Sequence, residues 1–171
     1  MVNRSLLDNN VQNVLSFGPM FSQTSEYALR VAVYLASLDS KQATISQIAQ
    51  ATRTPEGYLA KVLRSLALAE LVRSQRGPQG GSMLARPAKH ITVYDVIQAV
   101  DPIQRITTCP LGIKGHGLNL CPLHRRLDQA IAMVEDAFRK TTIAELVGAP
   151  AGPQPLCDLP PARRKDRRVR I

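Results

Sequence analysis

Two cysteines and a histidine are the first residues whose types and spacing could do chemistry. Cys109 and Cys121 flank a glycine-rich segment that contains His116, and His124 follows three residues after Cys121. Thiolate and imidazole groups are ligands for zinc and for iron–sulfur clusters, and a glycine-rich loop can turn its amides toward the sulfurs of a cluster. These residues therefore predict a loop over residues 102–123 that carries candidate metal or cluster ligands.

Catalysis by the same residues is a weaker interpretation. A cysteine nucleophile could be assembled with His124 and Asp128, which lie four residues apart in a helical segment. Such a pair beside a cysteine is common by chance, and the sequence shows no oxyanion-stabilising element. We therefore predict that the chain is not an enzyme, and we assign no role to Cys157.

Basic side chains form the second group with chemical potential. The chain of 171 residues has 22 Lys and Arg against 13 Asp and Glu, which gives a formal charge of +9. Residues 53–89 hold seven basic and two acidic side chains, and residues 149–171 hold six and two. This excess favours a polyanionic partner, nucleic acid or a membrane surface. For residues 149–171, which are also Pro-rich, a solvated and disordered tail is the simpler prediction.

Composition bounds the class of protein. No apolar run approaches the roughly 18 residues of a spanning helix, and no signal-peptide pattern opens the chain. Three cysteines are too few for a secreted disulfide scaffold. We therefore expect a cytoplasmic protein without a membrane partner. Residues 1–20 lack periodicity and read as an extension, which leaves Met20 as an alternative native start.

Helical periodicity predicts three short helices ahead of the cysteines. Apolar residues at helical spacing place the first over about 24–38. Thr44 and Gln47 form a capping-box pattern at the start of the second. We expect Thr54 to cap the third helix and Pro55 to take its first position. The buried stripe of this helix is predicted to be Leu59, Leu63 and Leu66, and another face carries Gly57, Lys61 and Arg64.

A hairpin is predicted to follow the third helix. Residues 71–74 and 82–85 read as strands, and the turn between them contains Arg76 and Gln79 among three glycines. The turn lacks the Gly-Lys-Ser/Thr ending of a nucleotide-binding loop. Three helices and a hairpin, in this order, predict a winged helix-turn-helix, which places a helix in the major groove of DNA and a hairpin tip on the adjacent backbone or minor groove. A hairpin that only closes a core is the alternative.

Helices are also predicted beyond the hairpin. Thr92 and Asp95 form a further capping-box pattern, and residues 101–122 read as irregular. From Leu123 an apolar seam recurs over about two and a half heptads, and 142–147 reads as a short closing helix.

Several blocks of the sequence together resemble the IscR/NsrR family of bacterial winged-helix transcription regulators. The resemblance covers about residues 20–148. The blocks that carry it are residues 21–30, Tyr58-Leu59, 71–81, 84–86, 95–101 and 142–147. It implies a homodimer joined by a long helix over about 124–140 and bound to double-stranded DNA at an imperfect palindrome. It further implies that Arg76 enters the minor groove and that residues from Gly57 to Lys61, with Tyr58, face bases. Ala60 stands where cluster-sensing members carry an acidic residue.

The resemblance also bears on the cysteines. Iron–sulfur members use Cys-x5-Cys-x5-Cys, followed in the IscR type by a histidine three residues later. Cys109, Cys121 and His124 match the outer positions and the histidine, whereas Gly115 replaces the central cysteine. Three interpretations stay open: a [2Fe–2S] cluster on these three residues with His116 or a group of a partner subunit, a thiol or zinc switch, and a loop that binds nothing.

The combined prediction is a mainly α fold with a small β-hairpin wing and a long dimerisation helix. We expect a winged helix-turn-helix domain over 21–101, the cysteine loop over 102–123, and the dimerisation and closing helices over 124–148. We predict a sequence-specific DNA-binding regulator, a repressor modulated at the 109–124 loop. The alternatives are a winged-helix protein-interaction module and a small metal or cluster carrier. The predicted DNA contacts are Thr54, Pro55, Gly57, Tyr58, Lys61, Arg64, Arg76 and Gln79.

Overall fold

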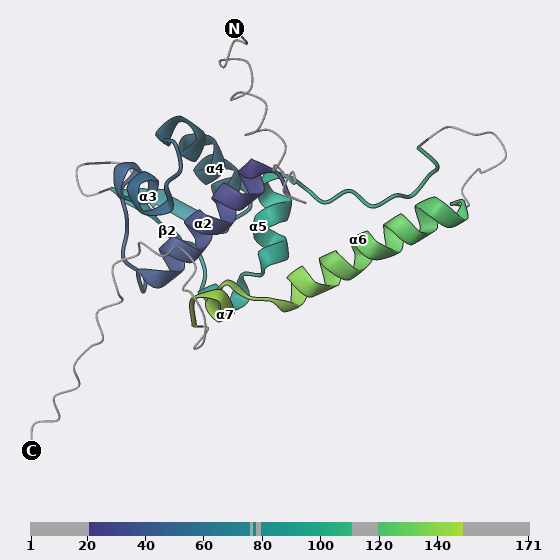
Figure 1. Ribbon diagram of the computed structural model, residues 1–171. Coiled ribbons are helices and arrows are strands. Elements are labelled where there is room, and N and C mark those ends of the chain that lie inside the picture. The colour runs from purple at the N-terminus through teal and green to yellow at the C-terminus, as the bar shows by residue number, and fades with distance from the viewer. Residues whose placement is uncertain (1–20, 76, 78–79, 111–119, 149–171) are drawn as a thin grey trace, which may run out of the picture.

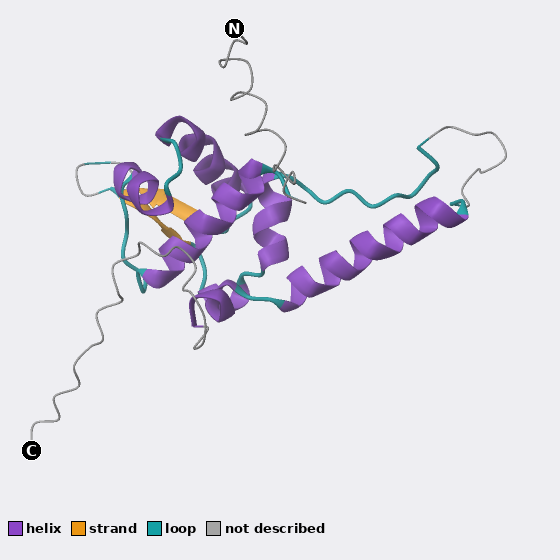
Figure 2. Cartoon of the chain, viewed as in Figure 1, coloured by secondary structure: helices purple, strands orange, loops and turns teal. Residues whose placement is uncertain are grey.

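A computed structural model describes residues 21–75, 77, 80–110 and 120–148 (Figure 1). Helices dominate, with one two-stranded antiparallel hairpin (Figure 2), as the sequence predicted. The elements in chain order are α2 Gln23–Ser37, α3 Ile45–Thr52, α4 Glu56–Leu68, β1 Val72–Gln75, β2 Gly81–Leu84, the 3₁₀ helix η2 Ala88–His90, α5 Val93–Val100, α6 Pro122–Lys140 and α7 Ile143–Gly148.

Two of the predicted capping boxes are confirmed. The Thr44 hydroxyl accepts the Gln47 amide at 3.3 Å, and the Gln47 side chain accepts the Thr44 amide at 2.9 Å. Thr92 and Asp95 make the same reciprocal pair, at 3.1 and 3.0 Å, at the start of α5. Each box satisfies amides that the helix itself leaves without a partner.

The predicted start of the third helix is wrong in its details. Helix α4 begins at Glu56, Pro55 precedes it as the cap residue, and no side chain caps it. Thr54 is 3% exposed, and its hydroxyl lies 2.9 Å from that of Thr52. Thr54 turns inward because the two hydroxyls satisfy each other in the interior, where an unpaired hydroxyl would be costly. The Pro55 carbonyl accepts the amides of Tyr58 and Leu59, at 2.9 and 3.0 Å.

The core lies between α2, α4 and α5. Helix α2 contributes Ala28, Val31 and Leu35, all at most 2% exposed. The predicted stripe of α4 is confirmed, since Leu59, Leu63 and Leu66 are buried, and Val62 joins them. This packing fixes one face of α4 and therefore determines which face is exposed.

The hairpin differs by one residue from the prediction in both strands. Its register pairs Val72 with Leu84 and Gln75 with Gly81. Outside the hairpin, Ala43 exchanges both backbone hydrogen bonds with Ser82, at 3.0 and 2.8 Å. A Cβ at Gly81 would lie 2.8 Å from the Ala43 carbonyl oxygen, so only glycine fits this close approach.

Helix α6 leaves the body of the molecule as an arm (Figure 1). None of its residues is buried. It begins with Pro122 at its first position, where the missing amide costs nothing. At its other end the Thr92–Thr142 bridge and a Phe21–Phe138 ring contact, with centroids 5.0 Å apart, attach it to the domain.

Candidate functional site

Helix α4 presents an exposed stripe opposite its buried one. At 100° per residue, Gly57, Lys61, Arg64 and Leu68 share this outer face, and all four are exposed. A Cβ at Gly57 would meet no atom within 4 Å, so the backbone there is open to an approaching molecule. The stripe offers two cations and a bare backbone segment on one side of a helix that the core holds firmly.

Tyr58 lies beside this stripe and is held by α2. Its ring makes an edge contact with Tyr27 at 5.8 Å between centroids, and 46% of the residue is exposed. The Arg30 guanidinium lies over the Tyr27 ring and forms an ion pair with Glu26. It also donates a hydrogen bond to the Thr52 carbonyl, at 3.3 Å. These contacts tie the start of α4 to α2.

A groove of about 790 Å³ runs between α4, the start of α3 and the hairpin. Arg64 lines it from α4, and Ser74, Gln75 and Gly77 line it from the hairpin side. Gly77 has a φ of +121°, which only glycine adopts readily, and its carbonyl accepts the Gly80 amide at 2.8 Å. Arg64 of the exposed stripe and the base of the hairpin tip therefore border the same groove.

The predicted DNA contacts fall into three groups in the structure. Pro55, Gly57, Tyr58, Lys61 and Arg64 are exposed on or beside α4. Thr54 is buried, and this takes its side chain out of the candidate interface. Arg76 and Gln79 lie outside the described residues, although their neighbours in the hairpin border the groove.

The cysteine site brings two thiols to one imidazole. Cys121 is the residue that precedes α6, and its Sγ lies 3.2 Å from His124 Nδ1. Cys109 Sγ lies 4.0 Å from the same nitrogen, and neither cysteine is disulfide-bonded. His116 and Gly115 lie outside the described residues. The arrangement can act as a thiol pair next to a proton acceptor or as part of a ligand set.

A [2Fe–2S] cluster requires four protein ligands. The two thiols and His124 are of the right chemical type, but among residues 21–75, 77, 80–110 and 120–148 no three His, Cys, Asp or Glu side chains are grouped closely enough to hold a metal ion. The described residues thus match the donor chemistry of a cluster and fall short of its number of ligands.

Arg105 fastens the segment before Cys109 to α6. Its Nε and Nη2 donate to the two carboxylate oxygens of Asp128, each at 2.6 Å, and Nη1 reaches Glu135 at 3.4 Å. The Ile106 amide also donates to Asp128, at 3.0 Å. The guanidinium hydrogen bonds hold the pKa of Asp128 below its ordinary value, and Asp128 raises the pKa of Arg105. The sequence analysis missed Arg105, because no local pattern marks a partner 23 residues away.

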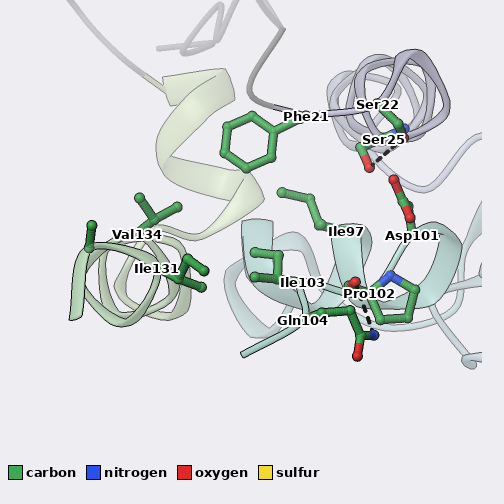
Figure 3. Close-up of a pocket in the computed structure, with 11 residues that line it drawn as sticks. Phe21, Ser22, Ser25, Ile97, Asp101, Pro102, Ile103, Gln104, Ile131 and Val134 are labelled. Carbon is green, nitrogen blue, oxygen red and sulfur yellow. Dashed lines mark hydrogen bonds between the residues drawn. The ribbon is translucent and has the colours of Figure 1, made fainter. Parts of the chain in front are cut away.

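A cavity of about 360 Å³ lies at the joint between the domain and α6 (Figure 3). Phe21, Ile97 and Ile103 face Ile131 and Val134 of α6 across it, and Asp101 lies toward Ser25 at the opposite end. The joint is therefore lined mainly by apolar side chains and is incompletely filled.

None of the helices that the structure describes combines the length and the apolar character that a bilayer crossing requires.

Comparison with known proteins agrees with this arrangement. Residues 21–149 match the Rrf2 family, described as an iron-dependent transcriptional regulator. A protein of Aquifex aeolicus (strain VF5), named as an HTH-type transcriptional regulator, is 30% identical over 131 residues, which are 75% of this chain and 91% of that one. The structure of CymR (YrzC), the global cysteine regulator of B. subtilis, is similar with a TM-score of 0.62 at 26% identity, over 74% of this chain and 94% of that one.

A further solved structure shares the fold. IscR of T. potens is similar with a TM-score of 0.62 at 23% identity, over 75% of this chain and 86% of that one. The family match spans the three helices, the hairpin, the cysteine loop and the long helix. The chain belongs to the Rrf2 family and is a DNA-binding transcription regulator with the winged-helix fold.

Proposed function

We propose that two copies of this regulator bind an imperfect palindrome in double-stranded DNA, each placing α4 in the major groove and the hairpin tip on the adjacent minor groove. The observation that carries the proposal is the exposed stripe of Gly57, Lys61 and Arg64 beside the groove that leads to the hairpin. A cationic helix face fits the major groove, and cations there neutralise phosphates.

The apolar face of α6 supports the homodimer. Leu123, Leu127, Ala130, Val134 and Ala137 recur at alternating spacings of four and three, which is the a/d pattern of a two-helix seam. Leu123 is 64% exposed and Leu127 is 47% exposed. Ala130 and Val134 also border the joint cavity, so the part of the stripe that gains most by packing against a second copy is the part around Leu123 and Leu127. Two symmetry-related α4 helices then enter successive major grooves, with half-sites about 10 bp apart.

Binding to DNA from the protein's own upstream region tests this function. We expect fluorescence anisotropy to show a specific complex that competitor DNA of unrelated sequence does not displace. The affinity should fall steeply as the salt concentration rises. Binding that ignores salt, or that does not discriminate between sequences, would contradict the proposal and favour a winged-helix module for protein partners. Repression is the sign of regulation that we propose.

The cysteine loop is the proposed site of modulation. Two thiols at one imidazole favour either a thiol switch or a metal site, with a [2Fe–2S] cluster as the family-type ligand. In that case Cys109, Cys121 and His124 would be ligands, and His116 or a group of the partner would complete the set. Such a cluster would supply sensitivity to oxidants. A shift of the loop would change the angle of α6 at the joint, where the cavity leaves space, and thereby the spacing of the two α4 helices.

An absorbance spectrum of anaerobically prepared protein, with iron and zinc analysis, tests the metal. A cluster would colour the protein, and Cys109→Ala would remove the colour and the iron. Colourless protein without zinc or iron would restrict the proposal to the thiols.

A further inference from the structure

We infer that Arg105 is a positioning residue, which holds Cys109 beside Cys121 and His124 and thereby sets how readily the two thiols form a disulfide. The inference deepens the proposed role of the cysteine loop and rests on that role for its regulatory meaning. It uses residues of this chain only and does not depend on a metal.

The contact geometry makes Arg105 a clamp. Its planar fork meets both oxygens of Asp128 at 2.6 Å, and its third nitrogen reaches Glu135 at 3.4 Å. A bidentate fork fixes orientation as well as distance, which a single ammonium does not. The Ile106 amide adds a backbone bond to the same carboxylate at 3.0 Å, so both the side chain and the main chain of this segment are held.

The clamp lies one helical turn from the thiol site. Cys109 is four residues after Arg105, and His124 is four residues before Asp128, so the segment runs antiparallel to α6. Four extended residues span up to about 13 Å. With Arg105 replaced, the Ile106 amide still bonds Asp128 but the bidentate side-chain contact is lost, so we expect Cys109 to be held less closely near His124 Nδ1.

The Arg105 guanidinium stabilises the negative charges of Asp128 and Glu135. The side chains of Asp128 and Glu135 are only 18% and 12% exposed, and partly buried carboxylates are costly without a partner. The basic side chains of α6 make contacts elsewhere: Arg125 with the Leu120 carbonyl, Arg126 with Gln129, Arg139 with the Tyr94 ring and Lys140 with Asp136. Arg105 therefore neutralises a site that these neighbours do not contact.

The reaction to be measured is exchange with glutathione disulfide. One protein thiolate attacks glutathione disulfide, forms a mixed disulfide and releases one glutathione. The second protein thiolate then attacks the mixed disulfide, the Cys109–Cys121 bond forms, and a second glutathione leaves. Two electrons pass from the protein to glutathione disulfide, and two thiol protons are released to the two glutathione thiolates. The equilibrium constant reports how closely the fold holds the two sulfurs.

The test uses the full chain carrying Cys157→Ser, so that two thiols remain. The oxidised fraction is measured by alkylation and mass spectrometry over a range of glutathione and glutathione disulfide. We expect Arg105→Gln to lower the exchange constant about tenfold, the lower end for a lost charge-assisted contact that is partly exposed. Arg126→Gln is the matched control, because Arg126 donates to Gln129 on α6 and not to Asp128 or Glu135, and it should leave the constant unchanged.

Further variants separate positioning from loss of structure. Arg105→Lys keeps the charge but loses the fork and should fall between the parent and Arg105→Gln. Arg105→Asp combined with Asp128→Arg should restore part of the constant that each substitution alone removes. Far-UV circular dichroism and the melting temperature monitor folding throughout. If Arg105→Gln does not fold, the inference is tested with Arg105→Lys and with the double variant Arg105→Asp, Asp128→Arg. An exchange constant that is unchanged in Arg105→Gln, or in Arg105→Lys where that variant is the one that folds, would overturn the inference.

The outcome is independent of the proposed function because the assay contains no DNA. If the exchange constant falls as expected in a chain that does not bind DNA, the positioning role stands and the proposed function fails. If DNA binding is normal and the exchange constant does not depend on Arg105, the positioning role alone fails.

Discussion

Two glycines show how differently the same residue type is used in this protein. A Cβ at Gly81 would lie 2.8 Å from the Ala43 carbonyl oxygen, whereas one at Gly57 would meet nothing within 4 Å. The first glycine is required by packing inside the molecule. The second leaves the backbone exposed on the outer face of α4, where the proposed DNA partner would approach.

The matched pair Gly81→Ala and Gly57→Ala tests this distinction. We expect Gly81→Ala to lower the free energy of unfolding by about 1–3 kcal/mol, because the backbone must shift to admit the methyl group. Gly57→Ala should leave it unchanged or raise it by about 0.5–1 kcal/mol, since alanine is the better helix former. Urea denaturation measures both. If Gly57→Ala keeps full DNA affinity, the backbone at Gly57 does not lie against bases.

Lys61 is expected to act through charge alone. Lys61→Ala should weaken binding to all DNA sequences alike and reduce the slope of log affinity against log salt by about 1, which is the signature of one lost phosphate contact. Lys140→Ala removes a lysine from the far end of α6, where it pairs with Asp136, and is the control. An unchanged salt slope for Lys61→Ala would place Lys61 outside the interface.

Among the elements, those defined by local chemistry were predicted best. The boxes Thr44–Gln47 and Thr92–Asp95 close within one turn, so four residues contain the whole signal. Thr54 carries the same local signal as a capping residue, but its burial against Thr52 overrides it. The bridge between Ala43 and Ser82 joins residues some 40 positions apart, and no pattern inside the hairpin reveals it.

In the candidate site, too, the features within one helix were predicted from the sequence and the contacts between segments were not. The exposed stripe of α4 follows from helical periodicity once Leu59 and Leu66 are recognised as buried. The contact between Cys109 and His124 was predicted only as shared ligand chemistry. The Arg105 clamp joins segments 23 residues apart, and its charges look like ordinary surface charges in the sequence. Sequence reasoning thus finds faces within an element more easily than contacts between elements.

The segment that carries Arg105 should respond to acid in a defined direction. The Arg105 guanidinium lowers the pKa of Asp128, and the Ile106 amide does the same. A group with a lowered pKa in the folded state stabilises that state above its unfolded pKa, about 3.9 for aspartate, and this stabilisation is lost as the pH falls through the folded value. The clamp should therefore be intact at neutral pH and weaken only in strong acid. Thermal melting of the wild type and Asp128→Asn from pH 7 to pH 3 measures this, and the difference in melting temperature should shrink toward the acid end.

At the scale of the whole molecule, α6 connects the cysteine site with the winged-helix domain. Its start carries Cys121 and His124, and its end packs on the domain through Phe138 and through Arg139, which stacks on Tyr94 at 3.4 Å from the ring centroid. Its middle contacts Arg105 on one side and borders the joint cavity with Ile131 and Val134. In the proposed modulation, a change at the cysteines would therefore reach the domain along this helix.

The dimer seam makes the last prediction, because one copy offers only one α4. Leu127 is an exposed member of the a/d stripe of α6, whereas Gln129 lies on another side of the helix, 200° away at 100° per residue. Leu127→Lys should place like charges against each other in the seam and convert the dimer to monomer in light scattering. DNA affinity should fall by far more than one lost phosphate contact, since a half-site bound alone forfeits the linked second contact. Gln129→Lys adds the same charge outside the seam and should stay dimeric with affinity intact. A Leu127→Lys protein that remains dimeric would place the interface on another surface, and the spacing of the half-sites would then have to be derived from that surface instead of α6.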